Sequence, residues 1–485
     1  MPVDMEHLVP PVRRALLRAN NLVRQAHSAV AQRFRHRVRT ALALAAIAAC
    51  DKAREATFPF LASPTTPKNS NNNASYTNAY AAASILFAVA TLQRLVLVPS
   101  TKSSSAQRNT TALAALRALD LAMLRAGTVL WGPIAAPFVN RASEIIAEGK
   151  VNPAVIPQLK NSKKKKSSES DNCNSLFLPA NLRHLFLNPH SREIPRIDAR
   201  TLSVADFRDR FMVNQPDDVP LPVILTHAID SWPAIARWKE PDYLVGVAGD
   251  RLVPIETYAR KDSHLSFLSK TWSHRVVTFD EYIRHYVFQQ QKPNDKDEQA
   301  YLAQHPLFEQ IPALRNDIGV PEFCSARTPQ DDATPFDCEA RMNPASPLVS
   351  AWFGPAGTVS PLHNDPYHNL LAQIVGSKFL RIYDARNTAR VYPQRSYLGQ
   401  NSRVDVEHVD EKMYPLFNTT PCWQCVLKEG ELLYIPRHAW HYVRSLEASF
   451  SASFWFGAKM DFVEVDKKGV YQAQYLKKGE SNSIQ

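Results

Sequence analysis

The spacing of apolar residues predicts a helical amino-terminal part. From residue 12 to residue 125, apolar side chains recur at intervals of three and four, the period of a helix with one buried face. Gly127 follows the last of these segments and is a typical helix stop. We therefore expect an all-α module with helices over residues 12–50, 80–98 and 111–125.

Two breaks separate the predicted helices. Residues 63–77 contain Pro64, Pro67 and four asparagines, and residues 99–111 begin at a proline. Proline and asparagine favour turns over helix interiors, so both segments are expected to be flexible loops. The result would be a small α-bundle or a repeat-like module, although no fixed repeat length is visible.

Two stretches of the helical part resemble targeting segments. Residues 13–39 are rich in arginine and lack acids, as in a mitochondrial presequence, but two acidic residues precede them and the helical pattern continues beyond. Residues 79–98 are long enough to span a bilayer, but Gln93 and Arg94 interrupt them and six are alanines. We favour a segment of the helical module over a presequence in the first case and a buried helix over a membrane span in the second, and we expect no membrane association.

From about Leu182 onward, the hydrophobic pattern changes to short runs with a period of two. Residues 350–456 hold several such runs, each ended by a turn signal, as in an antiparallel jelly-roll. The predicted fold class is α+β, a double-stranded β-helix of the cupin type with an all-α amino-terminal module. We place the helical module at 1–154, a basic Ser/Lys-rich linker at 155–180, a catalytic domain at 181–465 and a flexible tail at 466–485.

Composition is ordinary for a soluble protein, but the charge is unevenly distributed. The 485 residues are 45% hydrophobic and 21% charged. Residues 1–175 carry 23 Lys and Arg against 9 Asp and Glu, so the net charge of +11 belongs to the amino-terminal part. The lysine run at 163–166 is either a nuclear-import signal or a solvated linker. No nucleic-acid-binding motif accompanies it, so direct nucleic-acid binding is not expected.

The six cysteines indicate a reducing compartment. They are too few and too scattered for a secreted disulfide framework, so we expect a nuclear and/or cytoplasmic protein. Cys422 and Cys425 form a CxxC pair, but no second pair stands nearby to complete a zinc tetrahedron. Two packed thiols are therefore expected.

Two strand-like segments carry residues suited to a metal ion. His363 and Asp365 are two residues apart, so in a strand both can turn to the same face. His441 follows 78 residues after His363, at the end of another apolar strand pattern. Two imidazoles and one carboxylate leave the other positions of an octahedral ion free, which is the arrangement of non-haem Fe(II) oxygenases.

Two further positions bear on this hypothesis. His408 and Asp410 repeat the His-x-Asp spacing, but they lie in a polar stretch without strand alternation and are expected in a solvated loop. Lys378 begins a strand pattern fifteen residues after His363, so its ammonium could face a carboxylate inside the barrel. The alternative for Lys378 is a solvated lysine at a sheet edge.

Longer segments around these motifs resemble the Jumonji-C family of 2-oxoglutarate oxygenases. The resemblance covers residues 192–457, a little over half of the chain. It implies a double-stranded β-helix that uses Fe(II), 2-oxoglutarate and O2 to hydroxylate a protein side chain. The matching segments are 301–305, 307–308, 310–312, 351–355, 360–366, 430–436, 440–444 and 451–455.

The resemblance implies roles for seven positions around the metal. His363, Asp365 and His441 would be the iron ligands. The other four would bind 2-oxoglutarate, whose distal carboxylate would meet the Lys378 ammonium and accept hydrogen bonds from neighbouring polar groups. Those neighbours are Tyr301, Ser360 and Asn369.

Substrate contacts are implied at three further positions. Glu256 matches a family position that meets a substrate guanidinium, which a carboxylate can bind through two parallel hydrogen bonds. A surface glutamate is the alternative. Trp352 would border the same pocket, and Gln304 is a further candidate. After Glu256 the chain departs from the family, because the segment before Trp272 is longer by several residues.

The implied activity leaves alternatives open. Hydroxylation of a protein arginine is our first hypothesis. Demethylation of histone methyl-lysine uses the same metal and co-substrate residues, although a methylated ammonium would want an aromatic cage. A third hypothesis is a binding scaffold without turnover, but a scaffold has no need of an inward-facing charge. We expect a protein or peptide substrate, which could be chromatin-associated, and the sequence leaves the oligomeric state open.

Overall fold

The computed structural model forms two compact units. They comprise residues 1–169 with 250–253, and residues 170–249 with 254–485. The predicted borders near 154, 181 and 465 fall outside the described residues, so they stay predictions. The structure describes residues 10–31, 47–48, 50, 53–54, 70–97, 105–149, 188–213, 220–262, 269–288, 298–329, 331, 347–394 and 400–457.

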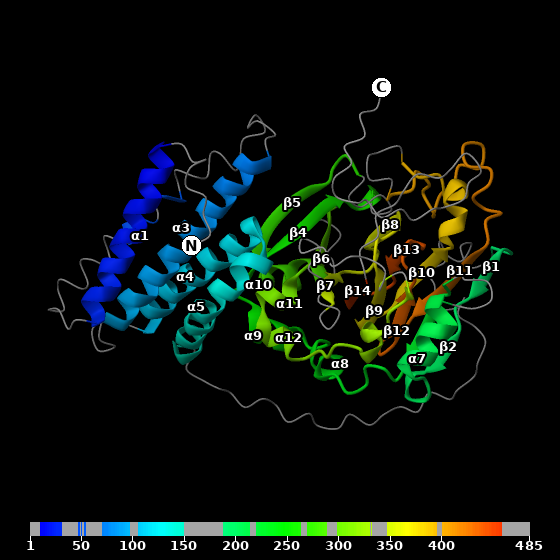
Figure 1. Ribbon diagram of the computed structural model, residues 1–485, viewed down its shortest axis with the longest axis horizontal. Coiled ribbons are helices and arrows are strands. Elements are labelled where there is room, and N and C mark those ends of the chain that lie inside the picture. The colour runs from blue at the N-terminus through cyan, green and yellow to red at the C-terminus, as the bar shows by residue number, and fades with distance from the viewer. Residues whose placement is uncertain are drawn as a thin grey trace. The chain divides into compact units, whose positions relative to one another are not determined.

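In the described part of the first unit there are four long helices, arranged as in Figure 1. Alanines along their facing sides are fully buried, among them Ala82, Ala90, Ala115 and Ala122. Small side chains let the helix axes approach closely, and larger residues such as Leu119 fill the space between them. The helices are α1 (Pro10–Ala31), α3 (Ser70–Leu97), α4 (Ser105–Ala126) and α5 (Thr128–Gly149).

The predicted loops of this unit are wrong in part. Helix α3 already begins at Ser70, inside the predicted loop 63–77, and α4 begins at Ser105, inside the predicted loop 99–111. No proline follows Pro67 or Pro99 in these stretches. Polar residues such as asparagine and threonine cost a helix less than about 0.7 kcal/mol each, so the helices extend backwards into them.

The end of α4 confirms the predicted helix stop at Gly127, whereas helix α5 was not predicted. Gly127 has a φ of 86°, and its amide donates to the carbonyl of Met123 at 2.9 Å, which ends the helix as expected. Helix α5 follows at once, but it contains Pro133 and Pro137, which break a helical pattern in the sequence. Among the described helices, none is both long enough and apolar enough to cross a membrane.

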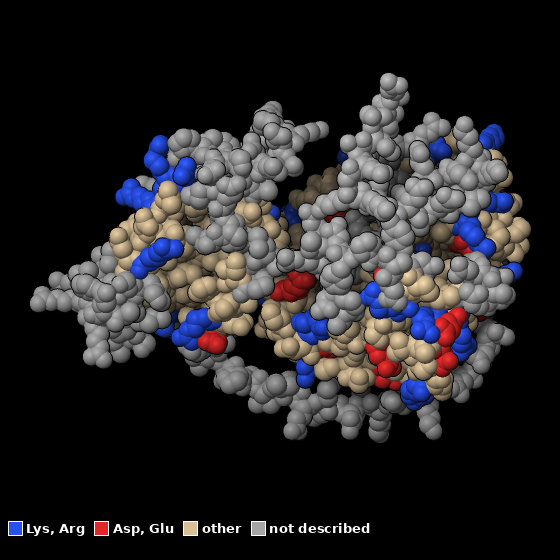
Figure 2. Space-filling view, in the orientation of Figure 1, with Lys and Arg blue, Asp and Glu red and all other residues tan. Residues whose placement is uncertain are grey.

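Most of the exposed charged side chains in the described part of this unit are basic. Figure 2 shows them over the face of the unit turned to the viewer. On α1 the buried stripe is Leu16, Ala19 and Val23, and the opposite side carries arginines. The exposed arginines of α1 and α4 are Arg13, Arg14, Arg18, Arg24, Arg117 and Arg125.

The second unit is built on two sheets, as predicted for a jelly-roll. One sheet has the strand order β1-β11-β10-β13-β8, and the other β2-β3-β12-β9-β14-β7-β6-β4-β5. Almost all neighbouring strands are antiparallel. The strands are β1 (Ser191–Glu193), β2 (Arg196–Asp198), β3 (Val223–Thr226), β4 (Leu252–Ala259), β5 (Ser273–Thr278), β6 (Glu298–His305), β7 (Leu348–Gly354), β8 (Val359–His363), β9 (His368–Val375), β10 (Lys378–Tyr383), β11 (Cys422–Leu427), β12 (Leu432–Ile435), β13 (Trp440–Ser445) and β14 (Ser449–Phe456).

The strand alternation assigns buried residues on the two faces of β10 and β13 to two separate clusters. Inward-facing residues of both sheets, such as Leu371, Leu380 and Val443, pack together in one cluster. The opposite faces of β10 and β13 carry Phe379 and Trp440, which pack in the other cluster with residues of the segment 391–417. Each residue on these two strands therefore has a defined side, which determines which residues can line the barrel interior.

The CxxC pair follows the same alternation. Cys422 lies in the outer cluster and Cys425 in the inner one, because residues three apart on a strand point to opposite faces. Both are buried free thiols, as predicted. Burial raises the pKa of the Cys422 thiol to about 11, so this thiol is unreactive at neutral pH.

Short helices cover the wider sheet, and one buried carboxylate ties them together. The Oδ atoms of Asp317 accept hydrogen bonds from the Trp238 indole at 2.9 Å, the Tyr243 hydroxyl at 2.6 Å and the Arg237 guanidinium at 2.7 Å. The helices are α7 (Val204–Phe207), α8 (Pro233–Arg237), α9 (Pro241–Ala248), α10 (Phe279–Tyr282), α11 (Leu307–Gln310) and α12 (Pro312–Arg315).

Replacing this carboxylate should destabilise the second unit. We expect Asp317→Ala to lower the free energy of unfolding by about 2–4 kcal/mol, because the indole and phenol donors lose their buried acceptor. Urea denaturation followed by tryptophan fluorescence measures the change. Asp230→Ala is the matched control, since Asp230 only pairs with His227 at the surface and should cost less than about 0.5 kcal/mol. Equal costs for the two variants would contradict this account.

Candidate metal and co-substrate site

Three predicted metal ligands lie together between two neighbouring strands. His363 ends β8, Asp365 stands two residues further on, and His441 of β13 is paired with His363 across the sheet. One potential ligand atom from each residue lies within 4.8 Å of the other two. The Nε2 atom of His441 is 3.6 Å from Oδ2 of Asp365. The three side chains can therefore share one ion.

Backbone carbonyls fix the tautomer of both histidines. The Nδ1 atom of His363 lies 2.7 Å from the carbonyl oxygen of Pro361, and Nδ1 of His441 lies 2.9 Å from that of Ala439. A carbonyl can only accept, so each Nδ1 carries the proton and donates it. Each Nε2 is then an unprotonated lone pair available to a metal, as outer hydrogen bonds arrange it in metal sites.

The electrostatics of these residues suit a cation. Burial raises the pKa of Asp365, and the neighbouring His363 opposes this only in part. Burial, together with the adjacent His363 ring, lowers the pKa of His441 well below its usual range. A neutral imidazole is the form that binds metal, and a divalent cation would stabilise the buried carboxylate. Among the described residues, this is the one group of His, Cys, Asp or Glu with metal-binding geometry. Its donors fit Fe(II).

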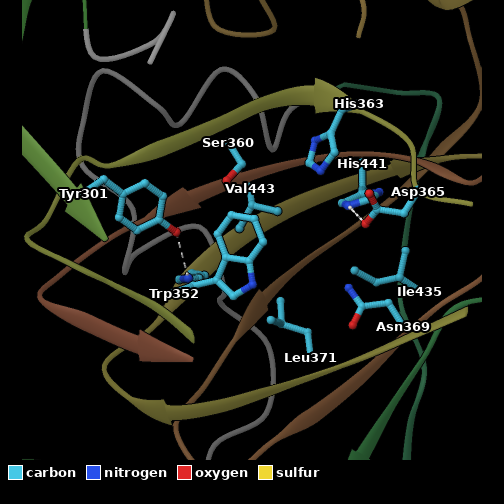
Figure 3. Close-up of a pocket in the computed structure, with 11 residues that line it drawn as sticks. Tyr301, Trp352, Ser360, His363, Asp365, Asn369, Leu371, Ile435, His441 and Val443 are labelled. Carbon is cyan, nitrogen blue, oxygen red and sulfur yellow. Dashed lines mark hydrogen bonds and ion pairs between the residues drawn. The ribbon is translucent and has the colours of Figure 1, made fainter. Parts of the chain in front are cut away.

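The triad lines a cleft in the second unit. Figure 3 shows the triad at one end, Tyr301 at the other, and Trp352 between them. Eight of the ten predicted site residues line this cleft: His363, Asp365, His441, Lys378, Tyr301, Ser360, Asn369 and Trp352.

Lys378 is buried in this cleft, contrary to the edge-lysine alternative. Its side chain is 1% exposed, and its Nζ contacts the Tyr301 hydroxyl at 3.5 Å. No carboxylate pairs with it among the described residues. Burial lowers the pKa of Lys378 to about 7. A lysine without a counter-ion fits a carboxylate ligand such as the far end of 2-oxoglutarate.

Polar groups of Tyr301 and Asn369 in the same cleft are also available to a ligand. Burial raises the pKa of Tyr301, and a hydrogen bond with Ser360 opposes this. Tyr301 is therefore a neutral phenol and a hydrogen-bond donor. The Oδ1 atom of Asn369 is buried without a hydrogen-bond partner. Buried polar atoms are normally paired, so this amide indicates a place where a ligand atom or water binds.

Glu256 lies next to the cleft but does not line it. It stands on β4, directly opposite Tyr301 of β6, so the two side chains share one face of the sheet. Its Oε2 atom is buried without a hydrogen-bond partner, and burial raises its pKa, with partial opposition from the indole of Trp272. A half-buried glutamate with one buried, unpaired oxygen atom is not the ordinary surface glutamate that was the alternative.

Gln304 does not lie in the cleft. It is exposed and has a φ of 48°, within the irregular pairing of β6 and β7 between Leu302 and His305. Because Gln304 is three residues from Tyr301, strand alternation also places the two side chains on opposite faces. Its substrate role stays a prediction.

Sequence reasoning missed four residues at the site. Leu371, Ile435 and Val443 supply the apolar lining, and their signal was the alternation with Asn369 and His441. Trp455 of β14 is paired with Asn369 across the sheet, and its indole Nε1 is buried without a hydrogen-bond partner. The indole donor of Trp455 and the amide acceptor of Asn369 thus stand at positions paired across β14 and β9, and both lack a hydrogen-bond partner.

The second His-x-Asp motif is a loop, as predicted. The His408 side chain is 70% exposed and contacts Asp405 rather than a second histidine. Asp410 accepts hydrogen bonds from the backbone amides of Lys412 and Met413, which is a turn interaction.

Comparisons with known proteins agree with this geometry. Residues 211–462 match the model of the cupin-like domain family. The chain is 39% identical over 271 residues to "Lysine-specific demethylase 8" of Xenopus tropicalis, which covers 54% of each protein. It is 40% identical to the protein of the same name from Danio rerio, over 56% of this chain and 59% of that protein. It is 38% identical to "Jumonji C domain-containing protein 5" of Drosophila melanogaster, over 54% of this chain and 60% of that protein. The chain thus spans little more than half the length of these curated relatives.

Proposed function

The chain belongs to the cupin-like domain family, and its relatives include a Jumonji C domain-containing protein. From this premise we propose that it is an Fe(II)- and 2-oxoglutarate-dependent oxygenase. The observation that carries the proposal is the presence, in one cleft, of the ligand triad and of a buried lysine without a carboxylate partner. Burying polar and charged side chains costs free energy, so a binding scaffold without turnover would have no reason to keep the triad and the buried lysine. Scaffold function remains the alternative if no succinate forms with or without peptide.

Each residue of the cleft has a proposed task. The triad would hold Fe(II), which together with 2-oxoglutarate and O2 supplies the oxidising power to hydroxylate a C–H bond. Lys378 would pair with the far carboxylate of 2-oxoglutarate, and Tyr301 and Ser360 would donate hydrogen bonds to it. Asn369 would orient the co-substrate near the metal. The apolar side chains of Leu371, Ile435 and Val443 would keep water from the reacting atoms.

We propose a methylated lysine of a protein as the first candidate substrate. The names of the relatives from Xenopus and Danio favour lysine demethylation, so the demethylase alternative has more support than our first hypothesis of arginine hydroxylation. The metal and co-substrate residues serve both reactions alike. Hydroxylation of an N-methyl group followed by loss of formaldehyde would complete the demethylation.

Arginine hydroxylation is kept as a second candidate because of Glu256. This glutamate is half-buried, its buried Oε2 atom has no hydrogen-bond partner, and it lies one strand away from the cleft residue Tyr301. Either basic side chain could meet its charge, but only a guanidinium donates two parallel hydrogen bonds to a carboxylate. Both candidates share a cationic protein side chain as substrate.

Mass spectrometry of the products separates the two candidates. Peptides containing methyl-lysine or arginine are incubated with the protein, Fe(II) and 2-oxoglutarate. Demethylation removes a methyl group and releases formaldehyde, whereas arginine hydroxylation adds one oxygen atom. Succinate formed without change to either peptide would contradict both substrate proposals and leave the oxygenase proposal standing.

Glu256 should affect peptide use and leave co-substrate use unchanged. We expect Glu256→Gln to lower kcat/KM for the active peptide by about 10- to 100-fold, because it loses a charge-assisted hydrogen bond of about 1.5–3 kcal/mol. The KM for 2-oxoglutarate should stay the same. Glu298→Gln is the control, since Glu298 on β6 pairs with Arg275 near the surface. An unchanged kcat/KM in Glu256→Gln would remove this residue from the substrate site.

The location of the protein is also a proposal. The scattered cysteines support a nuclear or cytoplasmic setting. The lysine run at 163–166 lies outside the described residues, so its role as an import signal rests on the sequence alone.

A further inference from the structure

We propose that Gly354 and Tyr282 are positioning residues that hold the ring of Tyr301 in place for the co-substrate. This inference rests on the proposed function, because it assigns to Tyr301 a contact with 2-oxoglutarate. It adds a device at the junction of β6 and β7, where two residues outside the cleft determine where a cleft residue lies.

The first part of the device is the absence of a side chain at position 354. A Cβ atom built on Gly354 would lie 2.7 Å from Cδ2 and 3.3 Å from Cε2 of the Tyr301 ring. It would also lie 3.0 Å from Cγ2 of Thr358. Contacts below 3.0 Å between carbon atoms are repulsive, so the Tyr301 ring lies in space that any other residue at 354 would occupy. Gly354 is not one of the glycines with a positive φ. The close approach of the Tyr301 ring, rather than the backbone conformation, therefore favours glycine at this position.

The second part is the hydroxyl of Tyr282. This residue is the last of α10, is fully buried, and donates its phenol proton to the carbonyl of Phe353. The same oxygen accepts a hydrogen bond from the amide of Leu302 at 3.0 Å. Leu302 and Phe353 are the residues paired across β6 and β7, so one side-chain oxygen bridges the two strands at that rung.

The bridged rung is next to the cleft residues. Leu302 follows Tyr301, and Phe353 follows Trp352, so the bridge fixes the backbone on which both rings stand. The pairing of β6 and β7 shifts register directly after Leu302, which leaves fewer ordinary ladder bonds to hold it. The Tyr282 ring also packs edge-on against Phe353, with ring centroids 5.6 Å apart. The phenol therefore stabilises an otherwise irregular junction.

The consequence for the site concerns one contact. The Tyr301 hydroxyl lies 3.5 Å from Nζ of Lys378, so a small displacement of its ring changes the pair of groups offered to a carboxylate. A misplacement of about 1 Å can cost up to about 100-fold in a well-oriented site. Changes at 354 or 282 should therefore weaken 2-oxoglutarate binding and leave metal binding intact.

The test uses the full chain and two independent readouts. Binding of 2-oxoglutarate to the Mn(II)-loaded protein is measured by calorimetry, and the position of Tyr301 by ¹⁹F NMR of protein labelled with 3-fluorotyrosine, with the resonance assigned through Tyr301→Phe. We expect Gly354→Ala to shift the Tyr301 resonance and to raise the Kd for 2-oxoglutarate by about 10- to 100-fold. The Kd for Mn(II) should be unchanged. Tyr282→Phe should have the same effects with a smaller shift.

Two control variants match these changes. Gly246→Ala adds a methyl group in α9 where no atom lies within 4 Å. Tyr286→Phe removes the hydroxyl of a neighbouring tyrosine whose ring stacks on Tyr282. The Tyr286 oxygen accepts a hydrogen bond from Arg275 on β5 and does not bridge β6 and β7. Neither control should alter the Tyr301 resonance or the Kd for 2-oxoglutarate.

The outcomes separate this inference from the proposed function. A Tyr301 resonance that does not move in Gly354→Ala would overturn the positioning role, whatever happens to co-substrate binding. A moved resonance with an unchanged Kd would overturn the link between Tyr301 and 2-oxoglutarate. Failure of the wild-type protein to bind 2-oxoglutarate would overturn the proposed function, and the resonance would still decide whether Gly354 places the ring. Should Gly354→Ala not fold, Tyr282→Phe decides by the same two readouts.

Discussion

Alanine in place of His441 is expected to abolish turnover and leave the fold of its unit largely intact. His441 reaches the site from a packed strand, and its Nε2 is one of three ligand atoms within 4.8 Å of one another. Loss of an outer partner of a metal ligand costs about 10- to 100-fold, so loss of a ligand itself should cost more than about 100-fold. Succinate release in the presence of Fe(II) and peptide measures the effect.

The second His-x-Asp motif supplies the control for this prediction. His408→Ala changes an exposed histidine of the same chain and should retain full activity. Circular dichroism and thermal unfolding show whether His441→Ala stays folded, as expected for a variant whose lost side chain has the Ala439 carbonyl and the Asp365 carboxylate as its polar contacts. Full activity in His441→Ala would refute the ligand assignment.

Methionine in place of Lys378 is expected to remove co-substrate binding and to stabilise the metal-free protein. Loss of one partner of a buried charge pair costs about 2–5 kcal/mol, so the Kd for 2-oxoglutarate should rise by about 30-fold or more. Without 2-oxoglutarate, the buried ammonium has no counter-ion among the described residues, so it lowers the free energy of unfolding. Replacing it with an apolar side chain should raise the free energy of unfolding by about 1–4 kcal/mol.

The opposite signs of these two effects make the prediction specific. Calorimetry measures the Kd, and thermal unfolding of the metal-free protein measures stability. Lys412→Met is the control, because Lys412 is exposed and should change neither quantity. A destabilised Lys378→Met variant would indicate that the ammonium already has a partner, and the co-substrate role would lose its main support.

The same lysine predicts how binding depends on pH. Its pKa of about 7 in the folded protein lies below the value of about 10.4 for a free lysine. A 2-oxoglutarate carboxylate needs the protonated form, so the Kd should be constant below pH 7 and rise by up to about tenfold per pH unit above it. Between pH 7 and about 10, the unfolded chain binds a proton that the folded chain lacks. The stability of the metal-free wild-type protein should therefore rise with pH in that window, and Lys378→Met should lose this dependence.

The parts of the site that stand on regular strands could be predicted from the sequence. Asn369, Lys378 and His441 lie on β9, β10 and β13, where alternation determines which residues turn inward. The short distance between His363 and Asp365 needs only local chain geometry. Their meeting with His441 depends on strand pairing, which became predictable only through the resemblance to Jumonji-C proteins.

The irregular parts could not be predicted in this way. The pairing of β6 with β7 shifts register between Leu302 and His305, beside Gln304, and no local signal in the sequence marks this shift. Glu256 meets Tyr301 through the pairing of β4 with β6, and the two residues are 45 positions apart in the sequence. Helix α5 was missed because two prolines interrupt its pattern, and tertiary packing outweighs that local preference.

The central claim is that one divalent metal ion is held by His363, Asp365 and His441. The most direct test is a calorimetric titration of the metal-free protein with Mn(II) in the presence of 2-oxoglutarate, for the wild type and for alanine variants of each ligand. We predict one ion per wild-type chain, the same result for His408→Ala, and no comparable binding in the three ligand variants. Undiminished binding of one ion in all three variants would place the metal elsewhere and contradict this account.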